Sequence, residues 1–319
     1  MPTFDVLPMG RSSIDLYAHQ IGVPMTAVTS FDAYVGGCPT NISVGTRRLG
    51  LKSALLTAVG DDQVGDFVLS FLDREGVETR FIPRKPGHRT SAVVLTIMPP
   101  DRFPLTFYRD GCADRELTRD DVERAPIEES AMIVVTGTGL SHEPGRGATF
   151  FAAERAARGG VDVLVDLDYR GDQWRTRSEY AGLIDRLLAH ATVAVGTEEE
   201  VMAAADHDDL EMAIRRVLDA SRGPLVVKRG ERGASIYRRG EGRQDVAPFS
   251  ITVLNVLGAG DAFASGLIAG LRRGWPLERA VRLGNATGAI VVTRHGCANF
   301  MPTMPEVEAF VAEQGGWGW

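Results

Sequence analysis

Four residues near the C-terminus, Gly258, Ala259, Gly260 and Asp261, are of the types that can hold a phosphate group and move a proton. They follow a β-like run at 249–253 and open a helical run whose small or apolar residues recur at the spacing of one buried helix face. Glycines leave backbone N–H groups bare at a helix N-terminus, which is a ready site for an anion such as phosphate. Asp261, in the first turn, could take the proton of a substrate hydroxyl as the phosphate arrives. The alternative is an ordinary helix start, with Asp as a capping residue and Gly for close packing.

Two segments near the N-terminus offer places for a polar ligand. Asp15 follows a predicted strand at 4–9, and ligands of open α/β sheets bind beyond the carboxyl ends of strands. Asp15 is therefore a candidate acceptor for a sugar hydroxyl, with a turn aspartate as the alternative. Gly36 and Gly37 precede an amphipathic helix that ends before Gly50, so they suit either close approach of a ligand or a plain strand-to-helix turn.

Residues 91–98 and 105–109 are rich in β-forming side chains and are joined by a proline-rich connection, which predicts a hairpin. Together with residues 12–35, which have no clear helical period, this hairpin could form a small sheet beside the main one. Arg109 closes the hairpin. A guanidinium at the root of such a lid is a candidate clamp for an anion, although an exposed arginine is more often solvated.

The second half of the chain alternates regularly between strands and helices, which predicts parallel βαβ units in a doubly wound sheet. The predicted strands are at 131–136, 161–167, 192–196 and 224–228, and the helices are around 147–158, 178–190 and 208–221. Polar residues gather just beyond these strands, at Asp166, Asp168 and Arg170, at 198–200 and at 228–230. Each of these residues alone could be an ordinary solvated side chain, but their shared position at strand ends favours a ligand site.

The composition sets further limits. The chain has 319 residues, a formal net charge of −7 and a sequence pI near 5.5, which argues against a nucleic-acid partner. Its three cysteines are far apart and lack metal spacing, so we expect reduced thiols and a cytoplasmic location. The N-terminus lacks the pattern of a signal peptide, and no apolar run is long enough for a membrane span.

The common phosphate-loop, dinucleotide, serine-hydrolase and zinc-protease motifs are absent from the sequence. The sequence instead resembles the ribokinase-like (PfkB) carbohydrate kinases over essentially its whole length. The resemblance is carried by Gly36 and Gly37 with Asn41, and by the segment 258–261. The stretches 11–17, 36–41, 99–109, 227–230 and 293–297 resemble, within that family, kinases of myo-inositol catabolism.

This resemblance implies a single ribokinase-like domain over 1–319, with a central, mostly parallel sheet flanked by helices and a small β-sheet lid at about 12–36 and 90–110. It implies ATP and Mg²⁺ as cofactors, Asp261 as the catalytic base, and an anion hole made by the backbone amides of Ala259, Gly260 and Asp261, which follow Gly258. The implied substrate contacts are Asp15, Gly36, Gly37, Asn41, Arg109, Asp168 and Arg170. The implied nucleotide contacts are Lys228, Gly230, Gly233, Asn285 and Ala289, and Glu200 would organise the metal through water.

The implied reaction is phosphorylation of the terminal hydroxyl of a keto sugar acid, with 5-dehydro-2-deoxy-D-gluconate as the leading substrate. The alternatives are a 2-dehydro-3-deoxygluconate kinase, a fructokinase, a ribokinase, or a catalytically silent sugar-acid-binding regulator on the same fold. A homodimer through the lid is implied by resemblance alone. Two departures matter: Asn255 stands where the family usually has Asp, which leaves a monovalent-cation site in question, and Thr197 stands where the metal motif has Asn.

Overall fold

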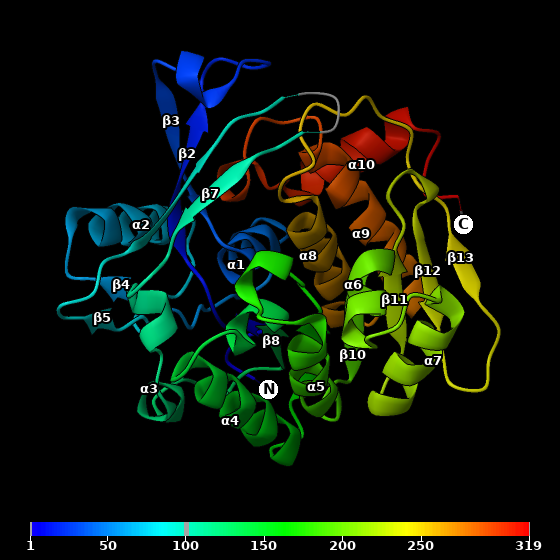
Figure 1. Ribbon diagram of the computed structural model, residues 1–319. Coiled ribbons are helices and arrows are strands. Elements are labelled where there is room, and N and C mark those ends of the chain that lie inside the picture. The colour runs from blue at the N-terminus through cyan, green and yellow to red at the C-terminus, as the bar shows by residue number, and fades with distance from the viewer. Residues whose placement is uncertain (1, 99–101, 319) are drawn as a thin grey trace.

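A seven-stranded sheet forms the centre of the computed structural model, which describes residues 2–98 and 102–318 (Figure 1). The strand order is β1-β8-β9-β10-β11-β12-β13. The strands are β1 (Leu7–Pro8), β8 (Met132–Thr136), β9 (Asp162–Asp166), β10 (Val193–Thr197), β11 (Leu225–Lys228), β12 (Ala234–Tyr237) and β13 (Gln244–Val246). The ladder is parallel from β1 to β11, and β12 and β13 are antiparallel, so the predicted mostly parallel sheet is confirmed.

Helices cover both faces of this sheet, which explains why its central strands are almost continuously apolar. One core cluster joins the sheet to α3 (Arg119–Glu123), α4 (Gly145–Arg158), α5 (Arg177–Leu188), α6 (Glu198–Ala204) and α7 (Leu210–Ala220). The other joins it to α1 (Cys38–Arg48), α8 (Ala259–Arg272), α9 (Leu277–Val291) and α10 (Met304–Glu313). α2 (Gln63–Arg74) packs in a third cluster beside α1.

A second sheet of four strands, in the order β3-β2-β6-β7, projects from the main body at the upper left of Figure 1. Its strands are β2 (Ser13–Ala18), β3 (Phe31–Gly36), β6 (Ser91–Leu95) and β7 (Leu105–Tyr108). β6 and β7 are antiparallel, which confirms the predicted hairpin, although residues 99–101 of its connection lie outside the described residues. We call these four strands the lid sheet. A further pair, β4 (Val59–Gly60) and β5 (Arg84–Lys85), lies near α2.

One strand expected from the sequence did not form, and a second apolar segment forms only isolated bridges. Residues 249–253 are not a strand, because β13 already occupies the sheet edge and Phe249 packs instead against Phe310 of α10, with ring centroids 5.4 Å apart. Residues 53–58 make only single bridges, to Val6, Met9 and Glu78, before β4 begins. In both segments the apolar residues are used for packing rather than for an extended ladder.

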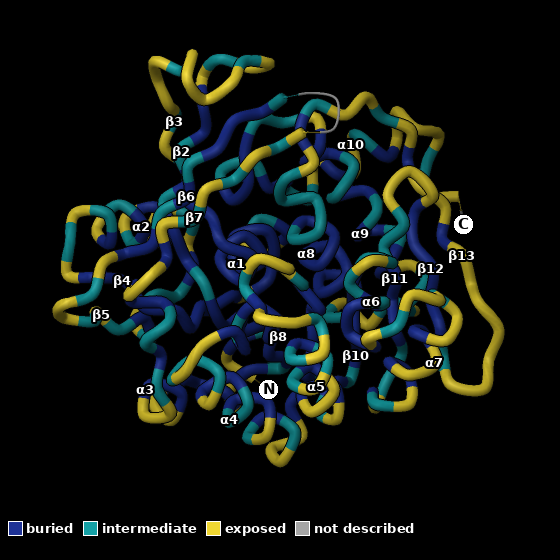
Figure 2. The backbone as a smooth tube through the Cα atoms, in the orientation of Figure 1, coloured by how far each residue is buried: buried dark blue, intermediate teal, exposed yellow. Residues whose placement is uncertain are grey.

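The fold brings α1 and α8 together at the centre of the molecule, where Figure 2 shows both helices mostly buried. A small residue permits this approach, because a Cβ on Gly45 of α1 would lie 2.3 Å from the Ser265 hydroxyl of α8. In the same way Gly266 permits α9 to approach α8, because its Cβ would lie 2.5 Å from the Thr287 hydroxyl. The N-termini of α1 and α8 therefore open toward the same space, beneath the lid sheet. Across the described residues, no helix has both the length and the apolar character needed to cross a membrane.

Candidate active site

A cavity lies where the N-termini of α1 and α8 meet the lid sheet and the carboxyl ends of the main strands. Its charged and amide-bearing lining residues are Arg11, Asp15, Asn41, Asp168, Arg170, Gln173 and Asp261. Its smaller and apolar lining includes Gly37, Thr138, Phe107 and Gly258. The cavity thus brings together the predicted base, most of the predicted substrate contacts, and the lid sheet.

Asp261 lies half-buried in the first turn of α8 and faces this cavity. Asn41 of α1 donates a hydrogen bond from Nδ2 to Asp261 Oδ2 at 2.6 Å, which fixes the orientation of the carboxylate. Burial raises the pKa of Asp261, and the hydrogen bond from Asn41 opposes that shift. A carboxylate with a raised pKa and a fixed orientation is suited to accept a proton from a hydroxyl.

The N-terminus of α8 begins at Gly258, whose left-handed φ of 80° suits glycine, and no side chain caps the helix. One part of the predicted anion hole is wrong: the Ala259 N–H does not point at the cavity, because it donates to the carbonyl of Val256 at 3.3 Å. The N–H groups of Gly260 and Asp261 have no such backbone partner among the described residues. These two amides can therefore receive an anion.

Lys228, at the end of β11, lies beside this helix start, because a Cβ on Gly260 would be 3.1 Å from Lys228 Nζ. Its ammonium is 3.7 Å from Asp166 Oδ1 and 3.7 Å from Glu200 Oε2. Burial lowers the pKa of Lys228, but these two carboxylates outweigh burial and hold the pKa above its usual value. Burial also raises the pKa of Asp166, against the opposing charge of Lys228. Lys228 thus stays charged and can neutralise phosphate near α8.

Glu200 and Thr197, the residue that departs from the family motif, form a capping box at the start of α6. The Thr197 N–H donates to Glu200 Oε2 at 2.7 Å, and the Glu200 N–H donates to the Thr197 hydroxyl at 3.2 Å. Within the described part of the chain, no group of three or more His, Cys, Asp or Glu side chains could hold a metal ion. Mg²⁺ commonly uses one or two carboxylates together with substrate phosphates and water, so Glu200 and Asp166 fit that role.

The predicted hydroxyl acceptor, Asp15, is buried in β2 and lines the cavity. Its Oδ1 accepts a hydrogen bond from the Ser13 hydroxyl at 2.6 Å, and burial raises its pKa. Both predicted glycines are required here by space. A Cβ on Gly36 would lie 1.9 Å from Asp15 Oδ2, and Gly37, at a φ of 107°, would place a Cβ 2.3 Å from the carbonyl oxygen of Arg11.

Asp168 and Arg170 are brought to the cavity by the loop after β9. Asp168 is buried, has a φ of 35°, and accepts hydrogen bonds from the Thr138 hydroxyl at 2.7 Å and from Arg170 Nε at 3.2 Å. Burial raises the pKa of Asp168, but Arg170 and Thr138 outweigh burial and keep the pKa below its usual value. Asp168 is therefore an ionised acceptor at the cavity wall.

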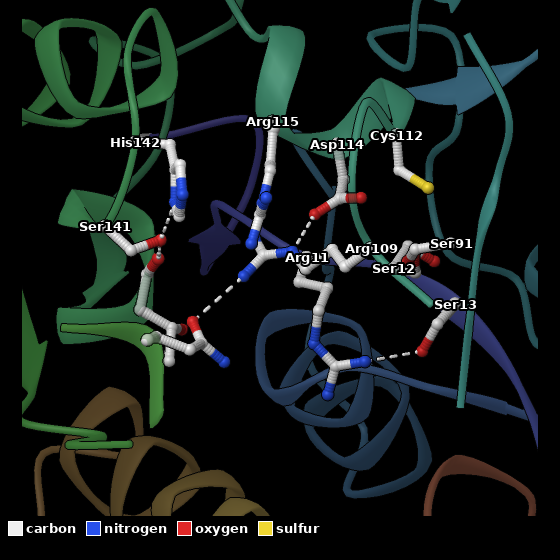
Figure 3. Close-up of polar contacts among 12 residues, drawn as sticks. Arg11, Ser12, Ser13, Ser91, Arg109, Cys112, Asp114, Arg115, Ser141 and His142 are labelled. Carbon is white, nitrogen blue, oxygen red and sulfur yellow. Dashed lines mark hydrogen bonds and ion pairs between the residues drawn. The ribbon is translucent and has the colours of Figure 1, made fainter. Parts of the chain in front are cut away.

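The structure does not support the prediction that Arg109 binds the substrate directly. Arg109 is buried outside the cavity, where Nε donates to Asp114 Oδ2 at 2.7 Å and a terminal nitrogen donates to Gln173 Oε1 at 3.3 Å (Figure 3). Gln173 does line the cavity, so Arg109 supports a lining residue from behind. Its guanidinium turned inward because Asp114, in the turn after β7, offers a fully buried carboxylate.

The remaining predicted nucleotide residues lie apart from this cavity, around the β11–β12 turn and α9. Gly230 and Gly233 have φ values of 57° and 78°, and a Cβ on Gly233 would lie 2.3 Å from the carbonyl oxygen of Val246. Asn285 Nδ2 donates to the carbonyls of Val246 and Ala247 at 3.2 and 2.8 Å. Ala289 lies one helical turn further along α9.

Sequence reasoning missed several lining residues, of which Arg11 and Gln173 are the most polar. The rule that ligands bind beyond strand ends would have found Arg11, because it follows β1 by three residues. No local signal pointed to Gln173. Asn255 is buried, and its side chain binds the Leu257 N–H at 3.0 Å and the His295 carbonyl at 3.3 Å, a pairing that an ionised Asp could not make with a carbonyl.

Comparison with known proteins agrees with this geometry. The family described as pfkB family carbohydrate kinase matches residues 4–304. The chain belongs to this family. It is a carbohydrate kinase with the ribokinase-like fold, so the fold and enzyme class expected from the sequence are confirmed.

Two relatives carry the same name. A 5-dehydro-2-deoxygluconokinase of Geobacillus thermodenitrificans is 35% identical, with 96% of this chain and 93% of the relative covered. One from Clostridium perfringens is 33% identical, with 98% and 94% covered. Among solved structures, a fructokinase from Vibrio cholerae O395 with bound fructose, ADP and calcium ion has a TM-score of 0.85 at 25% identity over 96% of this chain and 99% of that one.

A second solved structure, described as a ribokinase II from E. coli in complex with ATP and Mg²⁺, has a TM-score of 0.88 at 24% identity over 97% of this chain and 99% of that one. This likeness concerns the fold alone.

Proposed function

We propose that this kinase transfers the γ-phosphoryl group of ATP to the terminal hydroxyl of a keto sugar acid, with 5-dehydro-2-deoxy-D-gluconate as the substrate. The observation that carries the reaction type is Asp261, held by Asn41 at the uncapped N-terminus of α8 and facing the cavity. The choice of substrate is supported by relatives of that name at 33–35% identity over nearly the whole chain. It places the enzyme in myo-inositol catabolism.

The proposed mechanism assigns the proton transfer to Asp261. Its carboxylate orients the terminal hydroxyl and accepts the hydroxyl proton as the oxygen attacks the γ-phosphorus, an effect worth about 10²–10⁴-fold for positioned general bases. Asp15 and Asp168, both buried at the cavity wall, can accept hydrogen bonds from other sugar hydroxyls. Holding the hydroxyl in line with the phosphorus supplies the rest of the positioning.

The charge that develops on the phosphoryl oxygens is met by the N–H groups of Gly260 and Asp261 and by Lys228. By analogy with other oxyanion sites, each such donor is worth roughly 3 kcal/mol in the transition state. Glu200 and Asp166 would hold Mg²⁺ through water, and the bound ion would supply positive charge to the phosphate groups. Phe107 and other residues of the lid sheet line the cavity, and the sheet would keep water from the reacting phosphoryl group.

A test of the metal assignment follows from the capping box of α6. Glu200→Gln should raise the Mg²⁺ concentration for half-maximal rate by about tenfold, because a carboxylate that holds the hydrated ion becomes a neutral amide. The matched control is Glu199→Gln, which changes an exposed neighbour on the same helix turn. A Mg²⁺ titration of initial rates that is the same for both variants would remove Glu200 from the metal site.

Two features stay predictions. A homodimer through the lid sheet is supported by exposed apolar side chains at Ile21, Met25, Phe31 and Tyr108, which all belong to the lid segments. The other is the monovalent-cation site, which is in question because a neutral amide at Asn255 replaces the usual carboxylate and both of its polar atoms are engaged.

The alternatives differ in the sugar rather than in the chemistry. A 2-dehydro-3-deoxygluconate kinase, a fructokinase or a ribokinase would use the same base and helix start, whereas a silent regulator would show no turnover. A coupled assay of ADP release, run across keto sugar acids and neutral sugars, separates all of these.

A further inference from the structure

The geometry points to Arg11 as the residue that binds the carboxylate of the substrate, an inference that rests on the proposed sugar-acid kinase function. Arg11 follows β1 and lines the cavity with its side chain half-buried. The sequence alone predicts no ligand contact for Arg11, although this residue opens the stretch 11–17. Three independent observations support the assignment: its lack of a carboxylate partner, its fixed orientation, and the charge of the cavity.

The first observation is how the nearby arginines are paired. Arg109 is bound to Asp114 at 2.7 Å, and Arg170 is bound to Asp168 at 3.2 Å. Arg11 donates from a terminal nitrogen to the neutral Ser13 hydroxyl at 2.7 Å, and no carboxylate oxygen of the described residues lies within 4.0 Å of its guanidinium. Two arginines, Arg11 and Arg170, are among the described residues that line the cavity. Arg170 is paired with Asp168, whereas Arg11 is not paired with a carboxylate of the described residues.

The second observation is that the Arg11 guanidinium is held in place before any ligand arrives. Its hydrogen bond to Ser13 continues to Asp15, because the Ser13 hydroxyl donates to Asp15 Oδ1 at 2.6 Å. Its guanidinium carbon also lies 5.4 Å from the ring centroid of Phe107 on the lid strand β7. Figure 3 shows the Arg11 guanidinium turned toward Ser13, while that of Arg109 turns toward Asp114. A planar fork fixed in this way loses little freedom when it binds a carboxylate through two N–H groups.

The third observation is electrostatic. The cavity wall already carries the carboxylates of Asp15, Asp168 and Asp261, and only Arg11 and Arg170 among its described lining residues offset them. An acidic substrate adds one more negative charge to this space. The reacting hydroxyl goes to Asp261 on α8, so the carboxylate at the other end of the sugar points away from α8. Arg11 lies against Phe107 of the lid, on the sugar side of the cavity.

The test compares kcat/KM for 5-dehydro-2-deoxygluconate and for fructose in the wild type, Arg11→Gln and Arg11→Lys. We expect Arg11→Gln to lose about ten- to a hundredfold more efficiency toward the acid than toward fructose, mainly as a raised KM for the acid, because a charge-assisted pair is removed. Arg11→Lys should recover part of that loss, since it keeps the charge without the fork. The KM for ATP should stay close to the wild-type value.

The matched control is Arg158→Gln, which removes the same charge from an exposed position on α4. Circular dichroism and thermal melting of each variant exclude loss of fold. Equal losses toward acid and fructose would overturn the inference, because Arg11 would then act by supporting Asp15. An unchanged preference for the acid would also overturn it and leave the proposed function standing. A wild type that phosphorylates both sugars equally well would overturn the substrate assignment and the role of Arg11 together.

Discussion

Asp261→Asn is expected to lower kcat by at least about a hundredfold, because the amide keeps the shape of the side chain and cannot accept the hydroxyl proton. Asn41 Nδ2, which donates to Asp261 Oδ2 at 2.6 Å, can still donate to the amide oxygen, so the local structure should persist. The KM for ATP should therefore change little. The measurement is steady-state turnover of the keto sugar acid at saturating ATP and Mg²⁺.

The pH profile gives an independent readout of the same residue. The pKa of Asp261 is raised from 3.8 by burial, so the base becomes protonated at a pH above 3.8. The wild-type kcat/KM should fall as the pH falls through that raised pKa, and the residual rate of Asp261→Asn should lack that fall. Asp185→Asn, at an exposed position on α5, is the matched control. Turnover of Asp261→Asn within a few-fold of the wild type would show that Asp261 is not the base.

Lys228→Met should be the most destabilising of these substitutions. It leaves Asp166 and Glu200, each 3.7 Å from the lost ammonium, without a cation, and breaking a buried pair in this way costs about 3–5 kcal/mol. The same change removes the cation beside Gly260, so the KM for ATP should rise by at least about tenfold. Urea unfolding and ATP titration measure the two effects separately.

The loss of stability in Lys228→Met should depend on pH through the carboxyl group of Asp166. The pKa of Asp166 is raised above 3.8 by burial, with Lys228 as the main opposing charge, so it rises further in Lys228→Met. A carboxyl with a raised folded-state pKa destabilises the fold as the pH rises from 3.8 through that pKa. In the wild type, where the pKa of Asp166 is about 7, the same loss occurs below that pH. The excess loss in Lys228→Met should therefore appear as the pH rises above 7 and should be larger at pH 9 than at pH 6. Lys52→Met, at an exposed position, is the control, and equal stabilities of the two variants would contradict the buried ion cluster.

The regular parts of the fold were predictable because their patterns are local. The strands β8 to β11 are largely continuous apolar runs, and helices between and after them begin at ordinary N-cap residues such as Thr176 and Asp209. The segment 249–253 resembles a strand but does not form one, because Phe249 packs on α10 and the segment does not pair in the sheet. The sequence of a segment does not show whether another strand already occupies the edge of the sheet.

The candidate site was predictable residue by residue only where a motif fixed the backbone. Gly36, Gly37 and Gly258 each occupy positions at which a side chain would clash or strain the chain. The roles of Arg11 and Arg109 could not be predicted in this way, because no motif fixes where their side chains lie. Arg109 turned to Asp114 and Arg11 took a place on the cavity wall, and such choices depend on which carboxylate the folded chain brings within reach.

The central claim is that the chain is an ATP-dependent kinase of a keto sugar acid. The most direct measurement is kcat/KM of the wild-type protein for 5-dehydro-2-deoxygluconate, 2-dehydro-3-deoxygluconate, fructose and ribose, from ADP release with phosphorus NMR of the product. We predict that the product carries one phosphate ester, on the terminal carbon. We also predict that kcat/KM for 5-dehydro-2-deoxygluconate exceeds that for either neutral sugar by about ten- to a hundredfold, which is the difference that one charge-assisted contact provides. Equal or better use of fructose or ribose, or no ADP release with any of the four, would contradict the claim.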